Sequence, residues 1–94
     1  MSDVQLQEQL QWDKGALSKF NLMIEKIPLF HRKIAQQVVH KKAELNAKGR
    51  DSLIVEESDI VRAFFSEVPF AFYSLMVRLL DEAGFHYKEH EPLG

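Results

Sequence analysis

The sequence predicts an all-α fold, a compact four-helix domain organised around one long central helix. Apolar residues recur every three or four positions along most of the chain, which is the spacing of one helix face. Two prolines and two glycines stand between these periodic segments, where helices begin and end. A chain of 94 residues is long enough for one domain. We expect that domain at residues 12–85, after a flexible N-terminus at 1–11 and before a polar tail at 86–94.

The first helix is predicted to begin at Asp13 and to end before Pro28. The Asp13 carboxylate can accept from the free backbone N–H groups of the first turn. Trp12 precedes this cap and Leu17 occupies the fourth helical position, the two positions of a hydrophobic staple. Proline disfavours helical dihedrals in the residue before it, so the helix stops at Ile27.

The central helix is predicted from Pro28 to Gly49. Proline suits a first helical position because its missing N–H needs no partner there. Gly49 stands where a left-handed residue commonly ends a helix. Two apolar ridges run along this helix, so it can be packed against on two sides. We expect a core ridge of large residues, Phe30, Ile34, Val38 and Leu45, beside a ridge of Ala35, Val39, Ala43 and Ala47.

A short bridge and two further helices follow the central helix. Residues 53–55 are apolar and β-branched, and the acidic first turn of the next helix, at 56–67, complements the helix dipole. The last helix, at 69–84, has more apolar surface than one face needs, which predicts either deep burial or a homodimer interface. At its end, Gly84 allows Phe85 to fold back onto Leu80 in a Schellman turn.

Composition narrows the function classes. The formal charge is −2, from 12 basic and 14 acidic residues, so a protein that coats nucleic acid is not expected. The absence of cysteine excludes disulfides and thiolate metal sites and fits a reducing compartment. No apolar run is long enough for a membrane span, and no secretory leader is visible. These features predict a soluble cytoplasmic protein.

Charge is distributed unevenly along the chain. The segment from Lys26 to Arg50 holds seven basic residues and one acid, Glu44, whereas residues 51–94 hold nine acids and three bases. One interpretation is two solvated faces of opposite sign. The other is a positive surface that meets an anion or an acidic partner, which includes a second copy of this chain.

No constellation predicts catalysis, and no cofactor is expected. The glycines form no phosphate-binding pattern, and the paired carboxylates stand at helix ends, where capping explains them. His86 and His90 are four residues apart and are weak candidates for metal ligands, but Gly84 and Pro92 flank them and disfavour a helix there. We therefore predict no metal site and no enzyme activity.

The central helix, the short bridge and the helix at 56–67 resemble the second half of a histone fold. The resemblance rests on a long helix, the Gly49-Arg50 turn, Ile54 and the following Asp59-Ile60. In that family the Gly-Arg turn approaches DNA phosphate and the isoleucine pairs with a second chain. The resemblance implies a DNA-binding alternative carried by four basic residues, Lys41, Lys42, Lys48 and Arg50.

A second resemblance covers residues 12–63. It rests on an ordered set of residues: Trp12, Ala16, Leu17, Ile27, Pro28, Phe30, Arg32, Ala43, Gly49 and Ile54. This order is similar to the C-terminal domain of the B subunit of light-independent (dark-operative) protochlorophyllide reductase. The chain departs from that family's pattern at Leu29 and His31, and the helix at 69–84 lies outside it.

The family resemblance implies an accessory role. In that family the small domain is an appendage of a nitrogenase-like enzyme and does not hold the cluster ligands. We therefore expect a non-catalytic domain that docks onto a larger protein partner, near a tetrapyrrole-reducing enzyme, or onto itself. A detached subunit of a tetrapyrrole oxidoreductase is the alternative. Arg32 is the one motif residue without a clear local role, because its planar guanidinium suits a carboxylate or an aromatic face, either of a partner or within the chain.

Overall fold

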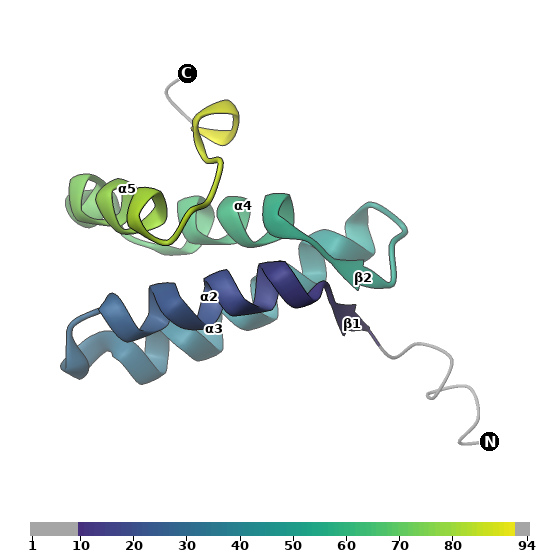
Figure 1. Cartoon of the computed structure of the whole chain (residues 1–94), viewed down its shortest axis with the longest axis horizontal. Helices are drawn as coiled ribbons and strands as arrows, with labels where there is room; N and C mark the ends of the chain where they lie inside the picture. Colours follow the sequence, from purple (N-terminus) through teal and green to yellow (C-terminus); the bar gives the residue numbers. More distant parts are fainter. Residues whose placement is uncertain (1–9, 92–94) are drawn as a thin grey trace.

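The computed structural model describes residues 10–91 and confirms the all-α prediction (Figure 1). Its four helices are α2 (Lys14–Lys26), α3 (Leu29–Gly49), α4 (Glu57–Glu67) and α5 (Tyr73–Glu82). Two short strands, β1 (Gln11–Trp12) and β2 (Ile54–Val55), and two 3-10 turns, η1 (Phe70–Phe72) and η2 (Lys88–His90), complete the described chain. The 21-residue α3 is the long central helix that the sequence predicts.

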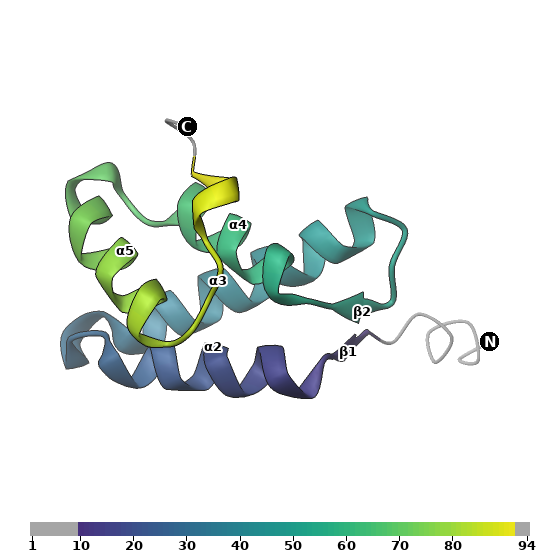
Figure 2. The same ribbon diagram turned by 45° about the horizontal axis from the view of Figure 1, so that its top comes forward.

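The helices form two layers. Helices α2 and α3 lie side by side as an antiparallel pair, and α4 and α5 pack over them (Figures 1 and 2). Helix α3 makes its most extensive contact with α4. The core between the layers is apolar and takes residues from every helix, with Phe20, Met23, Ile60, Phe64 and Leu80 among its largest fully buried side chains.

Strands β1 and β2 pair in parallel and join the start of the described chain to the loop after α3. The backbone N–H of Gln11 donates to the Leu53 carbonyl, and that of Asp13 donates to the Val55 carbonyl, both at 2.9 Å. Gln11 is therefore part of a strand, which corrects the flexible terminus expected at 1–11 for that residue. Residues 1–9 lie outside the described residues. Ile54 thus pairs with Gln11 of the same chain, and the pairing with a second chain that the histone resemblance implies stays a prediction.

The two ridges of α3 differ sharply in burial. Val39, Ala43 and Ala47 are fully buried, whereas Phe30 is 96% exposed and Ile34 is 66% exposed. The expectation that Phe30 lies in the core is therefore wrong. The small residues let α3 approach α4 closely, so that ridge faces the core and the large ridge is turned to solvent.

The turns at the two ends of α3 differ from the prediction by one or two residues. Pro28 immediately precedes the helix, and its carbonyl accepts from the His31 N–H at 3.0 Å. Gly49 is the last helical residue, and the left-handed residue is Asp51, with a φ of 60°. Aspartate tolerates this conformation because its short polar side chain can bond locally.

The C-terminal region is more ordered than a polar tail. The predicted helix at 69–84 begins as the η1 turn and continues as α5, and the Schellman turn at Gly84 is confirmed by a 3.0 Å bond from the Phe85 N–H to the Leu80 carbonyl. Tyr87 packs against the core, and the Tyr73 hydroxyl donates to Glu91 at 2.6 Å. That bond, helped by partial burial and the charge of Glu91, raises the pKa of Tyr73 to about 12. The tail prediction for 86–94 is thus wrong for residues 86–91, while 92–94 lie outside the described residues.

Within residues 10–91, no single helix has the length and apolar character to cross a membrane. Helix α4 and the segment Phe70–Glu82 pass that test only when they are joined, and they are bent by 116°.

Candidate functional site

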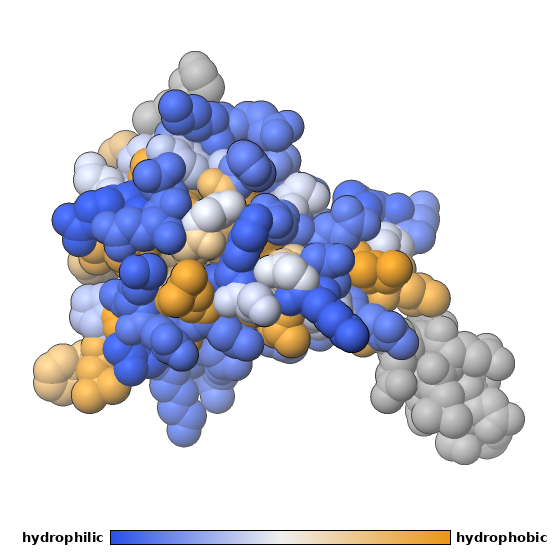
Figure 3. Space-filling view, in the orientation of Figure 1, coloured by the Kyte–Doolittle hydropathy of each residue, from blue (hydrophilic) through white to orange (hydrophobic). Residues whose placement is uncertain are grey.

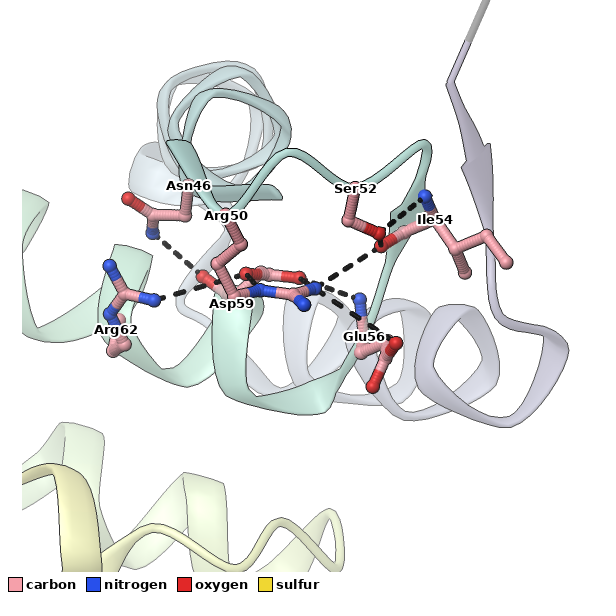
Figure 4. A network of polar contacts seen from close by, with 7 residues as sticks. All are labelled: Asn46, Arg50, Ser52, Ile54, Glu56, Asp59 and Arg62. Atoms are coloured by element: carbon pink, nitrogen blue, oxygen red, sulfur yellow. Dashed lines mark hydrogen bonds and ion pairs between the residues drawn. The ribbon is translucent and has the colours of Figure 1, made fainter. Parts of the chain in front are cut away.

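The turn after α3 contains an ion pair between Arg50 and Asp59 (Figure 4). The Arg50 Nε donates to Asp59 Oδ1 at 2.9 Å, and Nη2 donates to Oδ2 at 2.6 Å. The Asp59 side chain is 0% exposed, and it also accepts from the Glu56 backbone N–H at 2.9 Å as part of a capping box for α4. This bidentate geometry joins the C-terminal end of α3 to the first turn of α4.

Neighbouring groups complete this network. The Asn46 side chain donates to the Asp59 carbonyl at 2.9 Å, and Arg62 lies 3.9 Å from the Asp59 carboxylate. Burial by itself would raise the pKa of Asp59, but the hydrogen bonds from Arg50 and Glu56 and the two arginine charges hold this pKa below its usual range. The hydrogen bond to Asp59 likewise raises the pKa of Arg50.

In the predicted basic site around Gly49 and Arg50, the charge of Arg50 is therefore paired within the chain. The Arg50 guanidinium faces Asp59, and its contact with DNA phosphate stays a prediction. Lys41 and Lys48 are exposed on α3, whereas Lys42 is half-buried. Gly49 is exposed, and a Cβ added to it would meet no atom within 4 Å. No close approach therefore requires a glycine there.

Trp12 fixes β1 and the start of α2 against α3. Its ring stacks on His40 with centroids 4.4 Å apart and tilts against Phe20 at 5.2 Å. Its indole N–H donates to Glu44 at 3.1 Å. The hydrophobic staple expected with Leu17 is replaced by these contacts, and Leu17 is at the protein surface.

Arg32 closes the C-terminal end of α2. Its Nε and Nη2 donate to the Ile27 carbonyl at 3.2 and 3.0 Å, and Nη2 also donates to the Glu25 carbonyl at 2.9 Å. The internal bond is thus to backbone carbonyls and not to a side-chain carboxylate. The last carbonyls of a helix lack intrahelical partners, and a forked guanidinium can satisfy several of them. This local role explains an arginine at position 32.

An apolar cleft of about 370 Å³ lies where the two helix layers meet. One wall is the first half of α3, and the other is formed by η1 and α5. The remaining lining comes from α2, from α4 and from the two corners between helices: Met23, Phe64, Glu67, Ile27, Pro28, Val68 and Pro69. The His31 and Phe72 rings, one from each wall, have centroids 6.1 Å apart.

Exposed apolar side chains surround the cleft. Figure 3 shows one apolar group at the end of the molecule where α3 begins and another at the opposite end, beside β1 and β2. The large ones around the cleft are Leu29, Phe30 and Ile34 on α3 and Phe70 and Phe72 on η1. We call this group, together with the cleft, the apolar end. A contiguous exposed apolar patch of this kind is typical of an interaction surface.

The sequence contains a signal for the apolar end that periodicity does not reveal. Two corners share one pattern, a β-branched residue, a proline and a phenylalanine within the next two positions: Ile27-Pro28-Leu29-Phe30 and Val68-Pro69-Phe70. Each proline starts a new helical segment, and both prolines line the same cleft. The phenylalanines of both corners, Phe30 and Phe70, are exposed to solvent.

Among the described residues, two that line the cleft are ionisable, His31 and Glu67. Glu67 is the last residue of α4, so its carboxylate lies near the negative end of a helix dipole. Within residues 10–91, the Glu67 carboxylate accepts one hydrogen bond, from the Ser66 hydroxyl at 3.1 Å. The cleft therefore combines an apolar interior with a negative charge at one edge.

The weak metal candidates are not brought into a metal-binding group. His86 is exposed and His90 lies in η2. Among residues 10–91, no three His, Asp or Glu side chains are placed to hold a metal ion together. Comparisons with protein families, curated proteins and solved structures found no match to this chain.

Proposed function

We propose that this chain is a non-catalytic docking domain that binds an amphipathic helix of a partner protein at the apolar end. The observation that carries the proposal is the cleft, whose walls are apolar and whose rim exposes large side chains. An accessory role next to a larger, tetrapyrrole-reducing enzyme, which the family resemblance implies, is consistent with such a surface and is part of the proposal.

The spacing along the walls favours a helical occupant. On α3, His31, Ile34 and Val38 line the cleft at intervals of three and four residues. On the facing wall, Phe72, Leu75 and Leu79 show the same intervals. Two facing rows of this kind suit the apolar face of a third helix, as in helix-in-groove recognition.

A defined peptide probe tests this docking. We expect a display library of amphipathic helices to yield peptides that bind the domain, and Ile34→Lys to weaken their binding by about ten- to a hundred-fold, because a charge would enter the apolar contact. Leu45→Lys is the matched control, since Leu45 is exposed on the same helix and does not line the cleft. Titration calorimetry measures both. Equal loss in the two variants, or no loss in either, contradicts the proposal.

The DNA-binding alternative has a narrower basis. Lys41 and Lys48 are exposed and take part in no ion pair among residues 10–91, which favours an anion contact along α3. If DNA binds there, a gel shift should appear at low salt and disappear steeply as salt rises. Lys41→Glu/Lys48→Glu should abolish the shift. No shift at low salt ends this alternative.

The detached-subunit alternative requires a tetrapyrrole site. A pigment seated in the apolar cleft would show a shifted absorption band, and Ile34→Lys would remove the shift. No shift with excess protein ends this alternative as well.

A further inference from the structure

We propose that the helix which occupies the cleft is α3 of a second copy of this chain, in a two-fold symmetric dimer. The inference rests on the proposed docking function, because it names the partner of the same cleft. It places the dimer contact on α3, whereas the sequence predicts it on the helix at 69–84. The lining of the cleft favours an occupant with an apolar helix face and a positive charge, and α3 has both.

A positive charge on the occupant is favoured by Glu67. This exposed residue lines the cleft and takes part in no ion pair among the described residues. The C-terminal end of α4 adds partial negative charge beside it. A cation brought to this edge gains from both, which favours a lysine or arginine on the occupant.

Helix α3 presents the matching surface to solvent. At about 100° per residue, Phe30, Ile34 and Lys41 lie within about 40° of one another on the helix. The two apolar members of this stripe are the most exposed large residues of the helix apart from Leu29. Lys41 is exposed and makes no ion pair with any residue in the described range.

A two-fold axis can bring the exposed stripe of α3 in each copy to the cleft of the other copy. In such a dimer the same patch must contact itself, and α3 is both a wall of the cleft and the proposed occupant. Two α3 helices that cross antiparallel at Ile34 bring Lys41, seven residues later, opposite the start of the partner helix, where the corner residue Ile27 precedes α3. Ile27 and Glu67 line the same cleft. Each Lys41 would then meet Glu67 of the other copy, and the contact would occur twice per dimer.

A charge-swap experiment tests this arrangement. Sedimentation equilibrium should show the wild-type chain as a dimer, and Lys41→Glu and Glu67→Lys should each raise the dimer Kd by at least about tenfold, because each places like charges together. An equimolar mixture of the two variants should form a heterodimer close to wild-type affinity, since each opposite-charge contact is then restored. Lys48→Glu is the control for a charge change elsewhere on α3 and should leave the Kd within about twofold.

Each outcome decides between the two proposals. A wild-type chain that stays monomeric at its highest soluble concentration overturns the dimer, and so do variants that dimerise normally or fail to recover in the mixture. If the monomer still binds helical peptides and loses them with Ile34→Lys, the docking function stands and only its partner is different. If the monomer binds no such peptide, both proposals are wrong. Circular dichroism confirms that each variant is folded.

Discussion

Replacing Arg50 with alanine is expected to lower the free energy of unfolding by about 3 kcal/mol at neutral pH. The substitution leaves the Asp59 carboxylate charged, fully buried and without its bidentate partner. The network also connects α3 to the capping box of α4, so the two helices that make the most extensive contact lose a common anchor. Urea unfolding followed by circular dichroism measures the change. Arg78→Ala is the matched control, because Arg78 is exposed and its contact with Glu82 is 3.9 Å long.

The effect of Arg50→Ala should depend on pH in a specific direction. In the wild type the pKa of Asp59 is lowered from 3.8, so the stability that its charge contributes is present above that value and is lost as pH falls through the lowered pKa. In Arg50→Ala burial becomes the dominant influence and raises the pKa of Asp59. Its charged form then destabilises the variant as pH rises. The difference in stability should therefore be largest near pH 7 and shrink on acidification, and a pH-independent difference contradicts this account.

The sequence determined the helices well because their start and stop signals are local. Asp13 caps α2 with a 2.9 Å bond to the Ala16 N–H, and the turn at Gly84 closes as predicted. Periodicity could not decide which ridge of α3 is buried, since both have helical spacing. That choice depends on the close approach of α4 to Val39 and Ala43, which is a property of the whole fold.

The candidate site was less accessible to sequence reasoning. The prediction selected the basic residues near Gly49. The partner of Arg50 is Asp59, nine residues later. In the sequence, the acidic first turn that contains Asp59 is explained by the helix dipole alone. The pairing of β1 with β2 is likewise invisible in strands of two residues each. The cleft needs two distant corners brought together, at Pro28 and Pro69, and no local pattern specifies that they meet.

Two alanine substitutions of the same residue type should have opposite outcomes. Phe20 is 1% exposed and packs against Trp12 and Phe64 at centroid distances of 5.2 and 6.2 Å. Phe20→Ala is expected to lower the free energy of unfolding by about 3–5 kcal/mol, because it removes a ring from a filled core. Phe30→Ala should change it by less than about 0.5 kcal/mol, since that ring lies in solvent. Urea unfolding at a concentration where the chain is monomeric measures both.

The same pair separates folding from binding. Phe30→Ala should keep the fold yet weaken peptide docking and dimer formation, because the exposed ring lies on the same stripe of α3 as Ile34. Leucine, phenylalanine and isoleucine exposed at positions 29, 30 and 34 contribute little to the monomer's own core. If Phe30→Ala destabilised the monomer as strongly as Phe20→Ala, that ridge would be part of the core and the apolar end would not exist. If it spares the monomer and impairs association, the large ridge of α3 serves a contact outside the domain.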